Sequence, residues 1–382
     1  MNKIYFFTPI GLLLFIMALM SSCNGQKQPQ LPENELPESK IIPSESSTVK
    51  ENNDLRKSYG VSDVVSTSLL DKEGILWLGT NHEGIYRYDG TSFTHFSTRD
   101  GLCDNTITAI LEDRDGILWF GTADGLCRYD KKAFTHVPIP WVDTSSTWLD
   151  KVYPTVNPNA VRCLLQDKNG FLWIGTNGAG AYRYDGKTFT SFLSNEGRKQ
   201  EDSLYHNIIS SVVEDLAGNI WFTSMTHGGI SRYDGKSFTH FTLKNGLSDD
   251  MITSSLLDSK GNIWFGSLGN RAGGLHLYDG NAFTNFTETD GLSNKNIRSI
   301  HEDQTGKLWI GSDRGILSIY DANQSPRQGK KFIPFTSKEG QSFSRISFIT
   351  EDASGNIWFG GNYGNLFRYD GKTVTDFTQK GS

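Results

Sequence analysis

The sequence is poor in cysteine, in basic stretches and in long hydrophobic runs. Its 382 residues include 4 cysteines, and 37 lysines and arginines against 43 acidic residues give a formal net charge of −6. No long basic stretch occurs, which argues against nucleic-acid binding. Runs typical of helical bundles are scarce, whereas 40 glycines and 12% aromatic residues favour many short strands joined by turns.

The one apolar run lies at the extreme N-terminus and resembles a bacterial export signal. It extends from Ile4 to Met20, and the segment Met20 to Cys23 resembles a lipoprotein box. The resemblance implies cleavage before Cys23 and acylation of its thiol, which would anchor the protein to a membrane surface. We therefore expect a signal peptide over residues 1–22 and a polar, flexible linker over 23–57 that begins with lipidated Cys23. The alternative is an uncleaved anchor helix.

The rest of the chain is periodic. One tryptophan recurs in the same local setting at Trp77, Trp119, Trp173, Trp221, Trp264, Trp309 and Trp358. The intervals run from 42 to 54 residues with a mean of about 47, which is close to the repeat length of propeller blades.

Four strand-like pieces surround each tryptophan. In order, they are typified by Ile107 to Asp113, Leu118 to Thr122, Gly84 to Gly90 and Phe93 to Phe96. Asp-x-x-Gly joins the first two pieces and Asp-Gly joins the last two, and both signals indicate tight turns. Each unit is thus a four-stranded antiparallel meander with two apolar faces. Closing seven units into a ring buries these faces, which predicts an all-β, seven-bladed β-propeller over residues 58–380.

The repeated motif also resembles a known family. Asp-x-x-Gly-x-[Ile/Leu]-Trp-x-Gly-[Thr/Ser] followed by Gly-Leu-x-Arg-Tyr is similar to the two-component regulator propeller repeat, most closely in Glu112 to Arg128, Asp258 to Tyr278 and Glu302 to Gly315. Relatives are periplasmic sensor regions of bacterial hybrid two-component systems, many of which respond to glycan fragments. Because no kinase motif accompanies the repeats, we expect a stand-alone, monomeric lipoprotein of the bacterial cell envelope. The resemblance implies a role as a glycan-sensing accessory to two-component signalling. Virginiamycin-lyase-like proteins resemble the repeat more loosely, which leaves an enzyme as an alternative.

The repeated residues are scaffold candidates. We expect the seven tryptophans to pack between blades and the turn aspartates to stabilise turns rather than bind calcium. His95, His136 and His240 share one position on the outermost strand and are expected to face solvent. After Cys23 three cysteines remain, so at least one thiol is free and no disulfide framework is expected. Of these, Cys103 is the candidate for reactivity, and Cys127 and Cys163 are expected in the core.

Strand alternation places the connections between blades and the second-to-third loops on one face of the ring, which we call the loop face. Variable loops on a rigid frame are where binding usually occurs. The largest insertion, Pro138 to Asn159, carries Trp141, Trp148 and Tyr153. Their rings suit stacking on a sugar, and the alternative is a small local core that fixes a long loop.

The second-to-third loops add polar residues that differ from blade to blade. The candidates for ligand binding at the channel mouth are His82, Asn177, His227, Asn270, Arg271, Arg314 and Tyr363. Such a cluster suits an anion or acid–base chemistry, but no spacing indicates a metal site or a cofactor. The sequence favours a propeller that binds a glycan fragment or a partner envelope protein. The alternative is a periplasmic or surface lyase or hydrolase with its active site at the channel mouth.

Overall fold

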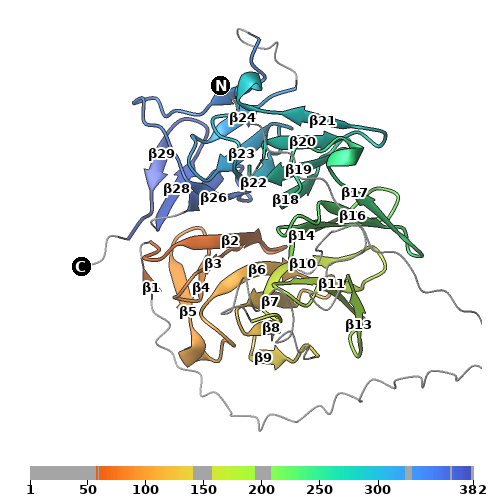
Figure 1. The fold of residues 1–382 in the computed structure, drawn as a ribbon. Coiled ribbons are helices and arrows are strands. Elements are labelled where there is room, and N and C mark those ends of the chain that lie inside the picture. Colours follow the sequence, from red (N-terminus) through yellow and green to blue (C-terminus); the bar gives the residue numbers. More distant parts are fainter. Residues whose placement is uncertain are drawn as a thin grey trace, which may run out of the picture. The chain divides into compact units, whose positions relative to one another are not determined.

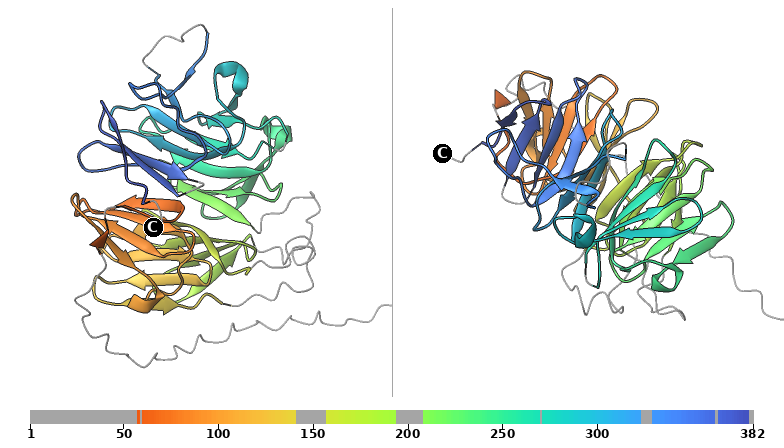
Figure 2. Two further views of the ribbon diagram at one scale, coloured as in Figure 1. Left: turned by 90° about the vertical axis from the view of Figure 1, so that its left-hand side faces the viewer. Right: turned by 90° about the horizontal axis from the view of Figure 1, so that it is seen from above.

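The structure, a computed structural model, describes residues 57–58, 60–140, 157–193, 208–269, 271–322, 329–361 and 364–379. Within these residues the chain forms seven antiparallel sheets, and the helical elements there are three short 3-10 turns. Figure 1 shows the first strand of each sheet nearest the middle of a ring and the last strand at its rim. Figure 2 shows from two further sides that each sheet is one twisted layer. The prediction of an all-β, seven-bladed propeller is confirmed.

Every blade contributes one inner strand and one tryptophan-bearing strand. The inner strands are β2 (Val65–Leu70), β6 (Ile107–Glu112), β10 (Val161–Gln166), β14 (Ile209–Glu214), β18 (Ile252–Leu257), β22 (Ile297–Glu302) and β26 (Ile346–Glu351). The second strands are β3 (Leu76–Thr80), β7 (Leu118–Thr122), β11 (Leu172–Thr176), β15 (Ile220–Ser224), β19 (Ile263–Ser267), β23 (Leu308–Ser312) and β27 (Ile357–Gly361). All the second strands are fully buried, because sheets cover both of their faces.

The outer half of each blade is shorter and more exposed. The third strands are β4 (Ile85–Tyr88), β8 (Gly125–Tyr129), β12 (Ala181–Tyr184), β16 (Ile230–Tyr233), β20 (Leu275–Tyr278), β24 (Ser318–Tyr320) and β28 (Asn365–Tyr369). The fourth strands are β5 (Phe93–Phe96), β9 (Phe134–Val137), β13 (Phe189–Phe192), β17 (Phe238–Phe241), β21 (Phe283–Phe286), β25 (Phe332–Pro334) and β29 (Val374–Asp376). The 3-10 turns η1 (Thr98–Asp100), η2 (Leu243–Asn245) and η3 (Glu288–Asp290) follow β5, β17 and β21.

The turn between the first and second strands is built around its aspartate. Oδ1 of Asp113 accepts the backbone N–H groups of Asp115 and Ile117, and Gly116 takes a φ of 79°. Oδ2 of Asp113 accepts the indole N–H of Trp119 at 2.8 Å. The same indole–carboxylate bond occurs in all seven blades. These aspartates therefore stabilise the turn, as predicted, and also satisfy the buried tryptophan.

The turn between the third and fourth strands uses a second aspartate. Oδ1 of Asp185 accepts the backbone N–H groups of Lys187 and Thr188. The bond from Thr188 contributes most, and together these bonds lower the pKa of Asp185 to about 2. The hydroxyl of Tyr184 donates to the carbonyl of Gly186 at 2.8 Å, which fixes the start of the turn.

The core lies between the blades. Buried apolar residues form seven clusters, and each joins neighbouring blades. Trp77 of the first blade, for example, lies 6.1 Å from the ring of Phe120 in the second. The seven tryptophans are each at most 8% exposed, which confirms that they pack between blades.

The ring closes between the first and seventh blades without a shared strand. The backbone N–H of Val61 donates to the carbonyl of Phe377 at 3.2 Å, and the N–H of Gln379 donates to the carbonyl of Val61 at 2.9 Å. A cluster containing Tyr88 and Trp358 packs across the same junction. The strand β1 (Lys57–Ser58) adds to the outside of β5. The sequence leaves two ways to close the ring, side-chain packing or an outer strand from residues near Ser47 to Lys50, and the latter residues lie outside the described part of the chain.

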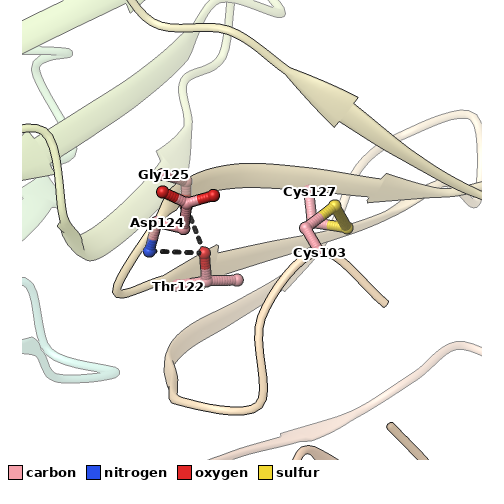
Figure 3. Close-up of a disulfide and its surroundings, with 5 residues drawn as sticks. All are labelled: Cys103, Thr122, Asp124, Gly125 and Cys127. Carbon is pink, nitrogen blue, oxygen red and sulfur yellow. Dashed lines mark hydrogen bonds between the residues drawn. A yellow bond between two sulfur atoms is a disulfide. The ribbon is translucent and has the colours of Figure 1, made fainter. Parts of the chain in front are cut away.

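One cysteine expectation is wrong. Cys103 and Cys127 form a disulfide with a Cα–Cα distance of 5.8 Å, so Cys103 is not a reactive thiol (Figure 3). Cys127 lies in the core, as expected, and is 0% exposed. Cys103 lies in the connection before β6, and Cys127 lies in β8. These segments adjoin because blade-to-blade connections cross the third strand, a proximity that sequence spacing does not encode. Cys163 is the free thiol among the described residues, and burial raises its pKa to about 12.

The shared histidine position of the fourth strand is only partly exposed. His136 faces solvent as predicted. His95 instead stacks on Tyr86 with ring centroids 4.6 Å apart, and Nδ1 of His240 lies 2.9 Å from the Ser231 hydroxyl. The neighbouring third strand supplies these partners and shields one side of each of the two rings.

Candidate functional site

The seven inner strands line a central channel. The second residue of each strand faces a cavity of about 400 Å³, and these residues are Ser66, Thr108, Arg162, Ser210, Thr253, Arg298 and Ser347. Asn81, Met225 and Asp313, which directly follow second strands, complete the wall together with residues beside the inner-strand starts. Inner strands begin and second strands end at the loop face, so the cavity opens there.

Five of the seven channel residues carry hydroxyl groups that tie one blade to the next. Each hydroxyl donates to the carbonyl of the first residue in the next inner strand. The donors are Ser66, Thr108, Ser210, Thr253 and Ser347, and the acceptors are Ile107, Val161, Ile252, Ile297 and Val65 respectively. The bond from Ser347 to Val65 joins the seventh blade to the first, so this ring of bonds also crosses the closure.

Arg162 and Arg298 take the same position in the third and sixth blades. The guanidinium of Arg162 donates to Oδ1 of Asn177 at 3.0 Å and contacts the sulfur of Met225 at 3.2 Å. Nε of Arg298 lies 3.6 Å from Oδ1 of Asp313. Burial lowers the pKa of Arg162, and the charge of nearby Arg298 lowers it further. Both guanidinium groups stay protonated at neutral pH, so they place positive charge in the channel.

A third arginine stands at the channel rim. Arg345 precedes β26 and holds a left-handed φ of 61°, an unusual conformation for a residue with a side chain. Among the described lining residues there are thus three arginines and one aspartate. The channel mouth is positively charged in a chain whose formal net charge is −6.

A family model decides what kind of repeat builds this channel. The model described as "Two component regulator propeller" matches residues 101–124, 155–178, 246–269 and 291–314. These are two-component regulator propeller repeats. Each matched segment covers the inner and second strands of a blade, in the second, third, fifth and sixth blades, and therefore contains the channel residue of that blade.

Solved structures resemble this propeller in fold. The extracellular domain of the putative hybrid two component system BT3049 from B. thetaiotaomicron is 23% identical with a TM-score of 0.62 over 84% of this chain and 39% of that one. This chain therefore covers well under half of that relative. Virginiamycin B lyase from Staphylococcus aureus is 17% identical with a TM-score of 0.54 over 72% of this chain and 85% of that one.

PorZ, a surface component of the type-IX secretion system of Porphyromonas gingivalis, is 16% identical with a TM-score of 0.54 over 80% of this chain and 47% of that one. No curated protein sequence matches the chain. At these identities the likeness to solved structures concerns the fold.

Six of the predicted functional residues lie outside the described part of the regulator propeller. They are Cys23, Trp141, Trp148, Tyr153, Asn270 and Tyr363. Their roles remain predictions. In the part of the chain that the structure describes, no helix is long and apolar enough to cross a membrane, and no three His, Cys, Asp or Glu side chains group to hold a metal ion.

The structure brings two predicted residues together on one aspartate. Nδ1 of His227 lies 2.8 Å from Oδ1 of Asp250, and Nε of Arg271 lies 3.6 Å from Oδ2 of the same carboxylate. Asp250 belongs to the connection between the fourth and fifth blades, so it joins the second-to-third loops of both. The His227 and Arg271 side chains are 45% and 55% exposed, which leaves the cluster open to solvent.

The other predicted residues do not join this cluster. Nδ1 of His82 lies 3.3 Å from Oδ1 of Asp63. His82 lines a separate cavity with Glu83, Tyr86 and Arg99. Arg314 is exposed on the loop after β23. None of His82, His227, Arg271 and Arg314 lines the channel cavity, so the expected convergence of these four at the channel is not found.

Asn177 is the predicted residue with a contact inside the channel, because it holds the Arg162 guanidinium. The sequence analysis did not identify Arg162 and Arg298 as candidate site residues. A usable signal exists in the repeats: the position after the first inner-strand residue is serine or threonine in five blades and arginine in two. Side chains that depart from an otherwise regular repeat position are the ones to examine.

Proposed function

We propose that this protein is an extracytoplasmic recognition module that binds its ligand at the mouth of the central channel. The observation that carries the proposal is the cavity of about 400 Å³ at the loop face, to which every inner strand contributes a side chain. A rigid ring with a concave, polar opening suits selective binding of a small ligand or of a loop from a partner protein. The ligand classes are a glycan fragment or an envelope protein.

Location outside the cytoplasm has three supports. The N-terminal run ending at Cys23 resembles a lipoprotein signal. The Cys103–Cys127 disulfide suits an oxidising compartment. The similar propellers include an extracellular domain of a two component system. We therefore place the propeller on a lipid anchor at the bacterial cell envelope, where it would serve sensing.

Binding to an oligosaccharide panel tests the site with two matched variants. Asn81→Trp adds bulk at the channel mouth, and Asn281→Trp adds the same bulk to a third-to-fourth turn on the opposite face. Neither side chain makes a described hydrogen bond, so both variants should fold. We expect Asn81→Trp to weaken binding by tenfold or more, because the ring occupies the ligand volume, and Asn281→Trp to leave the Kd unchanged. Equal affinities for both variants would contradict the proposed site.

A lyase or hydrolase is the second candidate, and one observation favours it. The exposed His227 with Asp250 beside its ring nitrogen has the form of an oriented acid–base pair, and Arg271 adds a cation. The same panel examined for product formation separates the two candidates. Turnover that is lost in His227→Ala and kept in His136→Ala would favour the enzyme.

A further inference from the structure

The channel position occupied by Arg162 and Arg298 has a structural role in the other five blades. There a hydroxyl donates to the next blade, and such a bond is worth about 1 kcal/mol. Among the described residues no side chain at 162 or 298 makes that bond. The thiol of Cys163, 3.8 Å from the Ile209 carbonyl, is a weaker substitute at the first of these junctions. The two arginines therefore replace a stabilising contact with charge.

The two positions lie nearly opposite each other. Arg162 is in the third blade and Arg298 in the sixth, so they are three blades apart in one direction around the ring and four in the other. Both line the same cavity, whose remaining inner-strand residues are serines and threonines. The opening is thus bordered by two cations across its width and by hydroxyl groups between them.

Within the described parts of the chain, most of the donors on Arg162 have no protein acceptor. A guanidinium carries five N–H donors, and those of Arg162 meet Asn177 and the weak acceptor Met225. No carboxylate of a described residue pairs with Arg162, although burial and the charge of Arg298 both penalise its protonated form. Asn177 and Met225 instead hold the planar group in place at the cavity wall. A positioned guanidinium with free donors is suited to bidentate binding of a carboxylate or a sulfate.

We propose that the channel mouth binds an oxyanion between Arg162 and Arg298, so that the ligand of this protein is acidic. The shared chemistry is a carboxylate or sulfate group. The surrounding serine and threonine hydroxyls donate to the next blade, and their oxygens can still accept hydrogen bonds from neutral hydroxyl groups of the same ligand. The inference rests on the proposed function, since it names the ligand class of the same opening. Arg345 adds positive charge at the rim.

The test uses variants that the fold itself supplies. Arg162→Ser and Arg298→Ser introduce the residue found at this position in other blades, so each can form the missing bond to the next blade and should keep or raise the Tm. Arg99→Ser, at an exposed arginine outside the channel, is the control for net charge. The probes are galacturonate, sodium sulfate and neutral galactose, titrated into the full-length protein at constant ionic strength by calorimetry.

We expect galacturonate or sulfate to bind and galactose to bind at least tenfold more weakly. Each serine variant should raise the Kd for the anion about tenfold, which corresponds to the lower end of what a hydrogen bond to a charged group contributes. The double variant should abolish binding. Binding of galacturonate alone identifies a carboxylate, and binding of sulfate alone identifies a sulfate. Failure of both anions to bind, an unchanged Kd in the double variant, or an equal loss in Arg99→Ser overturns the inference.

The two proposals fail separately. A neutral panel sugar that is lost in Asn81→Trp but retained by the double serine variant would leave the channel-mouth function intact and overturn its acidic ligand. If anion binding depends on the two arginines but a panel ligand binds Asn81→Trp as tightly as wild type, the acidic-ligand inference would stand and the proposed binding site for the panel ligand would be overturned.

Discussion

The buried tryptophans are the residues on which the blades depend, and each needs an acceptor for its indole N–H. The turn aspartate six residues earlier supplies it in every blade, at 2.8–2.9 Å. A buried donor without a partner costs roughly 1–3 kcal/mol. Sequence reasoning assigned the aspartate to the turn and the tryptophan to the core. It did not join them, because a turn motif does not specify which way the second carboxylate oxygen points.

His276 gives the protein a pH-dependent stability. It is 0% exposed, and Nδ1 lies 2.7 Å from Oδ1 of Asn285. Burial lowers its pKa, with the Asn285 bond acting in the opposite direction. Because the unfolded imidazole titrates near pH 6.5 and the folded one at lower pH, the unfolded state binds the proton more readily. This contribution to stability is present above about pH 6.5 and is lost as the pH falls below it.

We therefore expect the Tm to fall as the pH is lowered from about 7 to about 5. His276→Gln keeps a donor for Asn285 without an ionisable group and should show a shallower fall, whereas His136→Gln, at an exposed histidine, should match the wild type. Differential scanning fluorimetry across this range measures all three. Identical slopes for His276→Gln and wild type would show that His276 does not carry the effect.

At the scale of elements, the strands follow local sequence closely. The predicted pieces Leu118 to Thr122 and Phe93 to Phe96 are β7 and β5. Their ends are fixed by turn residues next to them in the chain. The sequence was less informative at the junction between the first and seventh blades, where the two ends of the propeller meet. The apolar pattern of the first blade would let its inner strand run from Val61 to Leu70, but β2 begins at Val65, and Val61 forms a bridge with Thr378 instead.

The disulfide is the element-scale feature with the largest expected effect. It closes a 24-residue separation between the connection before β6 and β8. For a loop of this length the chain-entropy model gives a stabilisation of about 3 kcal/mol. We expect Cys103→Ala to lower the free energy of unfolding by roughly that amount in urea titrations. Dithiothreitol should lower the wild-type midpoint similarly and leave the Cys103→Ala midpoint unchanged; an unaffected wild type would argue against the bond.

For the whole molecule, closure decides whether seven equal sheets make a ring. The inter-blade core, the channel hydroxyls and the backbone all continue across the junction of the seventh and first blades. The backbone link is small, consisting of two hydrogen bonds around Val61. The rings of Tyr88 and Trp358 lie 5.1 Å apart between centroids, within a cluster of buried apolar residues from both blades.

The backbone link is testable at one atom. Gln379→Pro removes the N–H that donates to Val61, and Gln379→Ala keeps it. The proline variant should lose about 1 kcal/mol of unfolding free energy relative to the alanine variant. Amide hydrogen exchange should also be faster at Val61, because its neighbour no longer holds the strand in register. Equal stability and equal exchange in the two variants would mean that packing alone closes the ring.

The sequence by itself determined the blades, since hairpin turns, alternating apolar residues and the repeated tryptophan all act within about 47 residues of chain. It also indicated the loop face, because strand direction alternates. Only the tertiary structure decided that Cys103 meets Cys127 and that Arg162 faces the same channel as Arg298. Other strands or whole blades separate those partners in the sequence. Their proximity depends on how the seven blades are arranged around the central channel and not on any local sequence pattern.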